Sequence, residues 1–232
     1  MRAARHVCVL TGAGISAESG VPTFRDAQAG LWAQYRPEDL ATPDAFARDP
    51  QRIWQWYEWR RGLVRKAEPN PGHRALADLA HRVPRFTLVT QNVDGLHQRA
   101  GSRDVIEYHG NLFRDRCSAE HAVRERATQS ASGLPECATC RALLRPDVVW
   151  FGEAIPSDAA RQADAAAAAC DVFVSIGTAA TVYPAAGLAS RARHRGATVI
   201  EINLEPTGLT DLADVALRGP AGQLLPPLVD AL

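Results

Sequence analysis

A glycine-rich turn near the start of the chain has the composition of a phosphate-binding loop. An apolar run at residues 7–11 leads into the segment Gly12-Ala13-Gly14-Ile15-Ser16-Ala17-Glu18. Gly12, Gly14 and Ala17 match the loose pattern Gly-x-Gly-x-x-Gly/Ala of dinucleotide-binding domains. Glycines in such a loop can take φ values closed to other residues and let backbone N–H groups approach a pyrophosphate, while the next helix presents its positive end. A glycine turn of this kind occurs in many folds, so alone it indicates a nucleotide site only weakly.

The acidic residue that usually accompanies this loop is missing from the sequence. In dinucleotide-binding domains an Asp or Glu closes the second strand about twenty residues later and holds the adenine ribose. Here the chain runs instead into Val21-Pro22-Thr23-Phe24-Arg25-Asp26, which does not have the pattern of a strand. A nucleotide would therefore have to be held in a different way from that of an ordinary dehydrogenase.

Polar residues follow four later apolar runs of the chain. They are Gln91-Asn92, His109-Gly110, Gly177-Thr178 and Asn203-Leu204-Glu205. An imidazole has an unperturbed pKa near 6.5, so His109 could act as a base close to neutral pH. Taken singly, these residues have simpler explanations, because a histidine can cap a turn and Asn92 can cap the following helix.

The elements that would position these residues alternate between strand and helix patterns. Apolar, β-branched runs predict strands at 7–11, 86–90, 105–108, 172–176 and 198–202. Helical patterns lie at 50–66, 72–82, 93–100, 158–170 and 184–195. This alternation predicts an α/β fold with a Rossmann-like parallel sheet and helices on both faces. Because ligands bind at the carboxyl ends of parallel strands, the polar residues that follow these runs would meet at one edge.

Two stretches depart from the alternation and read as insertions that form a smaller lobe. Residues 28–66 are rich in Trp and Arg and read as helices outside the sheet, while residues 114–147 are polar and contain three cysteines. We therefore expect a large lobe and a small lobe. The large lobe would comprise about 1–27, 68–113 and 148–232, and the small lobe about 28–67 and 114–147.

Bulk composition excludes several classes of function. Lys plus Arg and Asp plus Glu both total 26 among 232 residues, so no net charge attracts the protein to nucleic acid or an anionic membrane. No apolar run reaches the roughly 18 to 20 residues that span a bilayer. The short apolar start flows directly into the glycine loop and does not read as a signal peptide, which predicts a cytoplasmic protein. Five cysteines without an export signal favour thiols or metal ligands over disulfides.

Five motifs occur in order along the chain. They are Gly12-Ala13-Gly14-Ile15-Ser16, Pro22-Thr23-Phe24-Arg25-Asp26, Thr90-Gln91-Asn92-Val93-Asp94-Gly95-Leu96-His97, Glu107-Tyr108-His109-Gly110 and Gly177-Thr178-Ala179. Together they closely resemble the sirtuin family of NAD-dependent protein lysine deacylases, and the resemblance covers essentially the entire chain. It implies that residues 1–232 form a single catalytic domain with NAD as co-substrate.

The resemblance also assigns roles to site residues. It implies that His109 is the general base toward a ribose hydroxyl, that Asn92 positions the ribose and a water, and that Asp94 hydrogen-bonds the nicotinamide carboxamide. The family positions that contact NAD match Gly12, Ala13, Gly14, Ser16, Ala17, Glu18, Phe24, Arg25, Gln91, Asn92, Val93, Asp94, Gly177, Thr178, Ala179, Asn203, Leu204, Glu205 and Ala221. The last group, from Gly177 onward, would take the adenosine half and so replace the missing acid.

The implied reaction removes an acyl group from lysine. The acyl carbonyl oxygen attacks the nicotinamide ribose as nicotinamide leaves, and His109 then helps a ribose hydroxyl attack the acyl carbon. The products are free lysine and O-acyl-ADP-ribose. The segment Val149-Trp150-Phe151-Gly152-Glu153 matches the part of the family that pairs with the substrate peptide like an added strand. A buried apolar turn is the alternative explanation for it.

Tyr57 and Arg60 bear on the choice of acyl group. They lie three residues apart, so on a helix they share one face, and a guanidinium with a phenol could bind a carboxylate. The pair matches the Tyr-x-x-Arg of class III sirtuins, which remove succinyl and malonyl as well as acetyl groups. Ala41 also resembles that subclass, in which the alanine widens the acyl pocket. Without the family, Tyr57 would read as a core residue and Arg60 as a solvated one.

The family resemblance raises the question of a structural zinc. Most sirtuins hold zinc with two Cys-x-x-Cys pairs in a zinc-ribbon-like part of the small lobe. Here Cys137 and Cys140 form one pair, but Cys117 is followed at the matching position by Glu120. Glu120 or His121 could supply the fourth ligand, and a site that has lost its metal is the alternative.

Two other functions would use the same nucleotide site. One is a noncatalytic sensor of NAD or ADP-ribose, and the other is a mono-ADP-ribosyltransferase that modifies protein instead of releasing acyl groups. A sensor has no need of a base, so the presence of His109 with Asn92 and Asp94 favours the deacylase.

Overall fold

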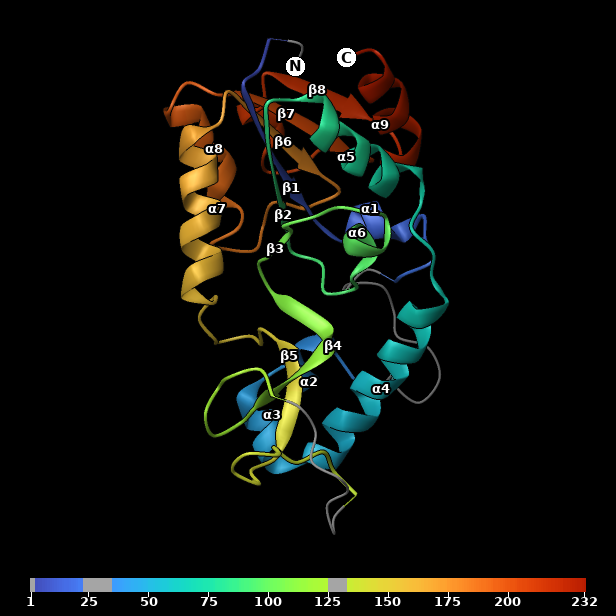
Figure 1. Cartoon of the computed structure of the whole chain (residues 1–232), viewed down its shortest axis with the longest axis vertical. Coiled ribbons are helices and arrows are strands. Elements are labelled where there is room, and N and C mark those ends of the chain that lie inside the picture. Colours follow the sequence, from blue (N-terminus) through green and yellow to red (C-terminus); the bar gives the residue numbers. More distant parts are fainter. Residues whose placement is uncertain (1–2, 23–34, 125–132) are drawn as a thin grey trace.

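A parallel β-sheet forms the centre of the larger lobe (Figure 1). The computed structural model describes residues 3–22, 35–124 and 133–232. Within these residues the sheet has six strands in the order β3-β2-β1-β6-β7-β8. Their bounds are β1 His6–Thr11, β2 Arg85–Thr90, β3 Ile106–Glu107, β6 Val172–Ile176, β7 Thr198–Asn203 and β8 Val215–Arg218. All neighbouring strands pair in parallel, which confirms the predicted sheet.

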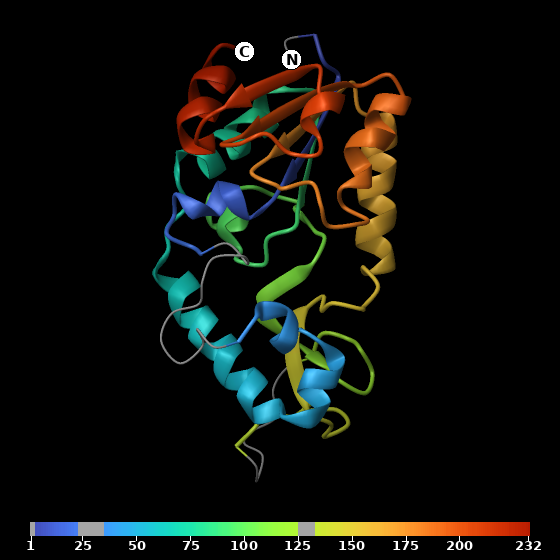
Figure 2. The same cartoon turned by 180° about the vertical axis from the view of Figure 1, so that it is seen from behind.

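Helices cover both faces of this sheet (Figures 1 and 2). One face is covered by α5 and α9, and the other by α7 and α8. Their bounds are α5 Pro71–Arg82, α7 Ser157–Ala169, α8 Gly187–His194 and α9 Ala221–Asp230. The sequence of β1 is continuously apolar because both faces of the strand are covered. Val7 and Val9 pack under α5 and α9, and Cys8 and Leu10 pack under α7 and α8.

The strand order reverses at β1, and this reversal defines the edge where a ligand can bind. Strands β2 and β3 extend the sheet on one side of β1, and β6, β7 and β8 extend it on the other. A crevice opens outside the carboxyl ends of the strands at such a point. Backbone bonds join the loops there: Gly12 N donates to Ile176 O at 3.0 Å, and Gln91 N donates to Thr11 O at 3.0 Å.

The small lobe combines helices with a two-stranded antiparallel ribbon. Its elements are α2 Pro37–Leu40, α3 Pro43–Arg48, α4 Pro50–Lys66, β4 Gly110–Cys117 and β5 Leu144–Val148. Figure 1 shows α2, α3 and α4 around the ribbon of β4 and β5, at the end of the molecule away from the six-stranded sheet. Aromatic side chains fill the space between helices and ribbon, and Trp54 donates its indole N–H to Leu144 O at 2.9 Å.

Capping residues in the sequence fix where the small-lobe helices begin. Thr42 caps α3 by accepting from Ala45 N, and Asp49 caps α4 by accepting from Arg52 N. A proline follows each cap in the first helical turn, where its missing N–H costs nothing. Helix α4 therefore starts at Pro50 and ends at Lys66, as the sequence predicted.

Other boundaries differ from the predictions. A helix was expected over 93–100, but α6 spans only Leu96–Arg99, because Gly95 has a φ of +72° and interrupts the helical backbone before it. Strand β8 was missed, since four partly exposed residues at a sheet edge give little apolar pattern. The short helices α1 (Ala13–Ala17) and η2 (Thr210–Leu212) complete the loops after β1 and β7.

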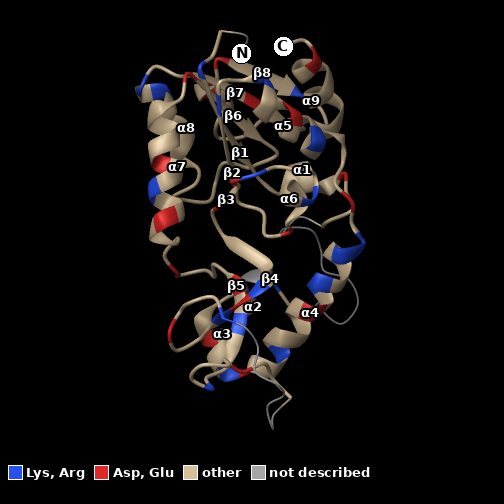
Figure 3. Ribbon diagram, viewed as in Figure 1, with Lys and Arg blue, Asp and Glu red and all other residues tan. Residues whose placement is uncertain are grey.

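Charged residues are interspersed over both lobes (Figure 3). Many form ion pairs on the surface, but some pairs have buried members. Arg61 is buried and donates to Asp115 at 2.7 Å and to Leu112 O at 2.6 Å. This pair ties α4 to β4 in the small lobe. None of the helices in the described part of the chain has both the length and the apolar character to cross a membrane.

Candidate active site

A cavity of about 810 Å³ lies between the two lobes at the reversal point of the sheet. It brings together most of the site residues that the sequence predicted. From the large lobe these are Gly12, Ala13, Gly14, Ser16, Gln91, Asn92, Val93, Asp94, His109, Gly177, Thr178, Ala179, Asn203 and Glu205. From the other wall they are Ala41, Tyr57, Arg60 and the five residues Val149 to Glu153.

Some predicted NAD residues do not line this cavity. The carboxylate of Glu18 accepts from Gly222 N at 2.9 Å, and Ala221 is buried at the start of α9. Leu204 is 58% exposed, and Ala17 is also exposed outside the cavity. Phe24 and Arg25 lie outside the described residues.

The glycines of the first loop serve close packing and not an unusual backbone conformation. Gly12 has a φ of −126°, which any residue can adopt, so the expectation of closed φ values is wrong there. A Cβ on Gly14 would lie 2.7 Å from Gly177 Cα, and one on Gly12 would lie 2.8 Å from Gly177 O. The loop after β1 and the loop after β6 thus touch, backbone to backbone, and Gly177 takes a φ of +59° to allow it.

The N–H groups of these two glycines are also committed within the protein. Gly12 N donates to Ile176 O at 3.0 Å, and Gly14 N donates to Gly177 O at 2.7 Å. The expectation that both would face a pyrophosphate is therefore not met. Their role in this structure is to hold the loops after β1 and β6 together beside the cavity.

Ser16 connects Asn92 and Asp94 at the floor of the cavity. Its hydroxyl donates to Asp94 Oδ2 at 2.7 Å and accepts from Asn92 Nδ2 at 3.1 Å. Asn92 Nδ2 donates also to Gly12 O at 3.0 Å, and Asp94 Oδ1 accepts from Leu96 N at 2.9 Å. Because these bonds fix both side chains from beneath, the amide oxygen of Asn92 and the carboxylate are held in set orientations.

Burial makes Asp94 a stronger base than an exposed carboxylate. Desolvation raises the pKa of Asp94, although the hydrogen bonds from Leu96 and Ser16 lower it. A buried carboxylate with an accepting lone pair suits an amide N–H donor such as a carboxamide.

His109 has a fixed tautomer. Its Nδ1 lies 3.1 Å from Gln91 O, and a carbonyl oxygen can only accept, so the hydrogen of the neutral ring is on Nδ1. The other nitrogen, Nε2, then carries the lone pair. Burial lowers the pKa of His109 below 6.5, and the bond to Gln91 only partly offsets this effect. The ring is therefore an unprotonated base at neutral pH, on the wall of the cavity.

A second layer of histidines lies below this site and was not singled out from the sequence. His97 Nε2 lies 2.9 Å from Thr11 Oγ1, which bonds Thr90 Oγ1 at 2.8 Å, and Thr90 in turn accepts from Asn92 N. His73 Nε2 lies 3.4 Å from Ser16 Oγ, and its ring centroid is 4.8 Å from that of His97.

Both rings are uncharged. Burial lowers the pKa of His73 to about 4 and that of His97 to about 3. Neither Nδ1 atom has a hydrogen-bond partner among the described residues. The sequence signal for this layer was weak: His97 closes the motif Thr90 to His97, but Gly95 interrupts the helical backbone, so helical spacing from Asp94 does not place His97.

Tyr57 and Arg60 lie together on the small-lobe wall of the cavity, as their helical spacing predicted. Burial raises the pKa of Tyr57 to about 12, so the phenol keeps its proton, and its oxygen accepts from Trp150 Nε1 at 2.8 Å. The Arg60 guanidinium lies 5.1 Å from the Trp56 ring centroid. Burial lowers the pKa of Arg60, but a guanidinium stays charged near neutral pH. The wall thus presents a cation and a hydroxyl donor.

The segment from Val149 to Glu153 forms a turn that the chain itself holds in place. Val149 N donates to His109 O, Phe151 N to Ala41 O and Glu153 N to Trp150 O. Arg145 supports the turn through a 2.7 Å bond to Glu153, with its guanidinium 4.1 Å from the Trp150 ring centroid. Arg145 was missed because it precedes the motif in a strand.

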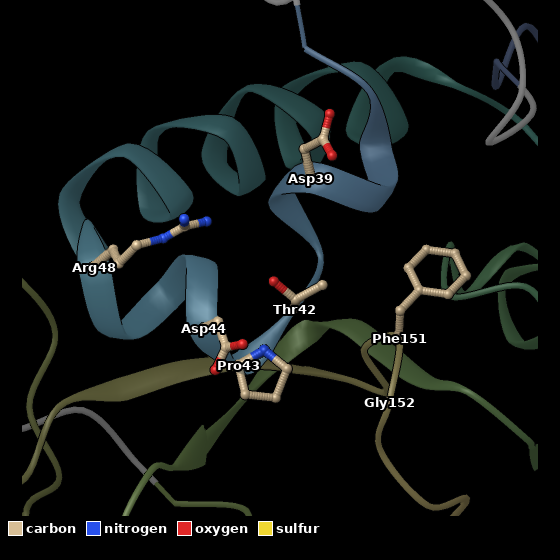
Figure 4. Close-up of a pocket in the computed structure, with 7 residues that line it drawn as sticks. All are labelled: Asp39, Thr42, Pro43, Asp44, Arg48, Phe151 and Gly152. Atoms are coloured by element: carbon tan, nitrogen blue, oxygen red, sulfur yellow. The ribbon is translucent and has the colours of Figure 1, made fainter.

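A second, smaller cavity of about 470 Å³ adjoins the same turn (Figure 4). Phe151 and Gly152 line both cavities. Figure 4 shows Thr42 and Pro43 facing them across the gap, with Asp39, Asp44 and Arg48 on α2 and α3 around it. The turn therefore separates the main cavity from a hollow on the small lobe.

Three cysteine sulfurs meet at the far end of the small lobe. The Sγ atoms of Cys117, Cys137 and Cys140 all lie within 4.8 Å of one another, and those of Cys117 and Cys140 are 3.4 Å apart. Backbone N–H groups, that of Cys140 first, lower the pKa of Cys137 to about 7. Sulfurs bound at about 2.3 Å to one tetrahedral zinc lie roughly 3.8 Å apart, so this donor set fits zinc.

Known proteins resemble this chain over almost its full length. Residues 12–184 match the Sir2 family. NAD-dependent protein deacylase 2 of Pyrobaculum aerophilum is 51% identical over 99% of this chain and 92% of its own length. The NAD-dependent protein deacylase of Ralstonia nicotianae is 52% identical over 99% of this chain and 93% of its own length.

Solved structures agree with the sequence comparison. A Sir2 homologue in complex with NAD superposes with a TM-score of 0.92 at 47% identity, over 99% of this chain and 90% of that one. A Sir2 protein bound to an acetylated peptide superposes with a TM-score of 0.87 at 30% identity, over 99% and 94% of the two chains. The match to the family covers most of the chain and includes the loops after β1, β2 and β6 that line the cavity. On this evidence the chain belongs to the Sir2 family.

Proposed function

We propose that this protein is an NAD-dependent protein lysine deacylase. The observation that carries the proposal is the tautomer of His109. Its Nδ1 is held by Gln91 O, and the residue lines a cavity with the glycine loops on one side and Tyr57 and Arg60 on the other. The deacylases of Pyrobaculum aerophilum and Ralstonia nicotianae support it as relatives. NAD, when bound, supplies an electrophilic ribose carbon and carries away the acyl group.

The chain's own residues would act on this substrate pair in three ways. His109 would take the proton of a ribose hydroxyl at Nε2, with Gln91 O holding Nδ1–H so that the ring cannot turn. Asp94, fixed by Ser16 and Leu96, would accept from the nicotinamide carboxamide. Asn92 would orient the nicotinamide ribose and a water with its amide oxygen, since both hydrogen bonds from its Nδ2 go to the protein.

We infer further that the adenosine half of NAD would lie toward the loops after β6 and β7. Thr178 and Asn203 are bonded to each other there, through Asn203 Nδ2 and Thr178 O at 3.2 Å, and both line the cavity. Phe24, Arg25, Ala17, Glu18, Leu204 and Ala221 remain in the proposed NAD set through the family resemblance.

The acyl group would lie against the small-lobe wall. A succinyl or malonyl group ends in a carboxylate, and Arg60 with the neutral hydroxyl of Tyr57 could bind it with charge-assisted hydrogen bonds. Ala41 is buried beside them and leaves room for an acyl chain longer than acetyl. We therefore propose removal of succinyl and malonyl groups in addition to acetyl groups.

The substrate peptide would run along the turn from Val149 to Glu153. The N–H groups of Val149, Phe151 and Glu153 already have partners within the chain. A peptide that adds to this segment as a strand would therefore pair with its carbonyl oxygens more than with its N–H groups. Such pairing contacts the peptide backbone and depends little on the peptide's side chains, so we expect the protein to accept peptides of different sequence.

The two lobes would act as one catalytic domain over residues 1–232, divided near 67, 113 and 147. The three cysteines would hold a structural zinc at the end of the small lobe. We propose the cytoplasm as the site of action, since none of the five cysteines, all of them in described residues, forms a disulfide. Equal numbers of acidic and basic residues give no reason to invoke a nucleic acid partner.

One assay tests the proposal. The protein is incubated with NAD and an acetyl-lysine or a succinyl-lysine peptide, and both nicotinamide release and peptide mass are followed. Loss of the acyl mass together with nicotinamide release is the expected result. NAD binding without turnover would instead identify a sensor, and a mass gain of ADP-ribose on protein would identify a mono-ADP-ribosyltransferase.

A further inference from the structure

Two turns of the cysteine cluster repeat the same backbone pattern twenty residues apart. Cys117 N donates to Ala122 O at 2.8 Å, and Cys137 N donates to Ala142 O at 2.8 Å. His121 N donates to Cys117 O at 2.9 Å, as Arg141 N does to Cys137 O at 3.0 Å. His121 and Arg141 also share a left-handed backbone, with φ values of 54° and 64° respectively. The two turns are therefore structural equivalents.

This equivalence decides between the two candidates for a fourth metal ligand. Glu120 occupies the place of Cys140, and its N–H points to Cys117 Sγ at 3.4 Å, as the Cys140 N–H bonds to the Cys137 sulfur. His121 occupies the place of Arg141, which turns away from the cluster to pair with Glu136 at 2.8 Å. The backbone position equivalent to a cysteine ligand is thus that of Glu120.

We propose that the carboxylate of Glu120 is the fourth ligand of a zinc ion held by Cys117, Cys137 and Cys140. Arg124 contacts one oxygen of Glu120, Oε2, through Nη2 at 2.8 Å and Nε at 3.1 Å. The other oxygen, Oε1, has no bond from any described residue, so it remains available to a metal. In the present rotamer the carboxylate lies outside the sulfur group, so the proposal requires this exposed side chain to rotate and bring Oε1 to the ion.

Charge also favours this arrangement. Three thiolates and one carboxylate around a divalent ion leave two negative charges, and Arg124 beside the cluster offsets one of them. In other metal sites a group that does not touch the ion hydrogen-bonds a ligand and so orients it. The Arg124 guanidinium would orient the Glu120 carboxylate in this way. Zinc accepts oxygen donors as well as sulfur, so this set is within its chemistry.

The test is the metal affinity and the ligand count of the purified full chain. Zinc K-edge absorption should give three sulfurs at about 2.3 Å and one oxygen at about 2.0 Å, and E120C should give four sulfurs. In competition with a chromophoric chelator, E120Q should bind zinc about tenfold or more weakly, whereas E120C should bind it more tightly.

A matched control lies on the other turn. Glu136 pairs with Arg141 as Glu120 pairs with Arg124, so E136Q removes a neighbouring carboxylate without touching the proposed ligand. It should keep the zinc affinity. Unchanged affinity in E120Q would overturn the proposal and leave water or another group as the fourth ligand, and failure of the unmodified protein to bind zinc would overturn it also. Circular dichroism checks that each variant is folded, and E120D serves in place of any that is not.

Discussion

The two walls of the main cavity are built in different ways. The large-lobe wall consists of loops at the ends of parallel strands, where Ser16 bonds to both Asn92 and Asp94, and each of these two also bonds to the backbone. The small-lobe wall consists of a face of α4 and the adjoining turn from Val149 to Glu153. Tyr57 there packs edge-on against Trp56 and accepts a hydrogen bond from Trp150, and Arg60 lies over the Trp56 ring. The first wall is determined by strand register and hydrogen bonds, and the second by aromatic packing.

This difference suggests a division of labour. A reaction needs groups held to within fractions of an ångström, which a sheet edge with satisfied hydrogen bonds provides. A choice among acyl groups needs only shape and charge at the end of a pocket. Changes on the large-lobe wall should therefore affect every substrate, and changes on the small-lobe wall should alter discrimination among substrates.

The strongest test of this division is His109→Ala. Removal of the base should lower kcat for acetyl and succinyl peptides alike by about 10²- to 10⁴-fold. Burial lowers the pKa of His109 below 6.5, so activity of the unmodified protein should persist at pH 6.5 and decline only at lower pH, where Nε2 gains a proton. Initial rates of nicotinamide release between pH 5 and 8 measure both effects. The exposed His81→Ala is the control, and equal rates in H109A and H81A would contradict the role given to His109.

The next largest effect concerns the histidine layer under the large-lobe wall. His73 has a pKa of about 4 when folded and 6.5 when unfolded, so the unfolded chain binds more protons between these values. Stability is therefore complete above pH 6.5 and falls as the pH is lowered, by roughly 3 kcal/mol for this ring alone. Urea denaturation at pH 7 and pH 5 measures the loss. His73→Gln should reduce the pH dependence of the free energy of unfolding. If this pH dependence is the same in the variant, His73 does not titrate with the lowered pKa.

Arg60→Met tests the small-lobe wall. Loss of a charge-assisted hydrogen bond of about 1.5–3 kcal/mol should lower kcat/KM for a succinyl peptide by about 10- to 100-fold. Activity on an acetyl peptide, which has no carboxylate to bind, should change far less. Arg60→Lys keeps the charge but not the planar guanidinium. Its kcat/KM for the succinyl peptide should therefore lie between those of the unmodified protein and Arg60→Met. Equal losses on both peptides would contradict the division between the walls.

The smallest effects come from a pair of glycines, one in each lobe. A Cβ on Gly14 would lie 2.7 Å from the Gly177 backbone, so Gly14→Ala should lower the free energy of unfolding by about 1–3 kcal/mol. A Cβ on Gly62, within α4, would meet nothing within 4 Å, so Gly62→Ala should raise it by roughly 0.5–1 kcal/mol. Thermal unfolding of the two variants should thus move in opposite directions, and a tolerated Gly14→Ala would refute the close approach of the loops.

Helices and strands with strong local sequence patterns were predicted correctly, and those with weak patterns were not. Strong caps and prolines marked the start of α4, and apolar runs marked β1, β2, β6 and β7. The edge strand β8 carried a weak pattern and was missed. The φ of Gly95, which delays α6, depends on a turn whose shape the sequence does not state.

The sequence by itself determined the family, the parallel sheet and the residue types at the cavity, because motif order, apolar periodicity and helical spacing are all written along the chain. The tertiary structure decided what depends on contacts between distant segments. Gly14 is required by its contact with Gly177, the tautomer of His109 is fixed by Gln91 O, and the equivalence of Glu120 and Cys140 appears only when the two turns are folded together. Each is a relation in space between segments well apart in the chain, and no local pattern records such a relation.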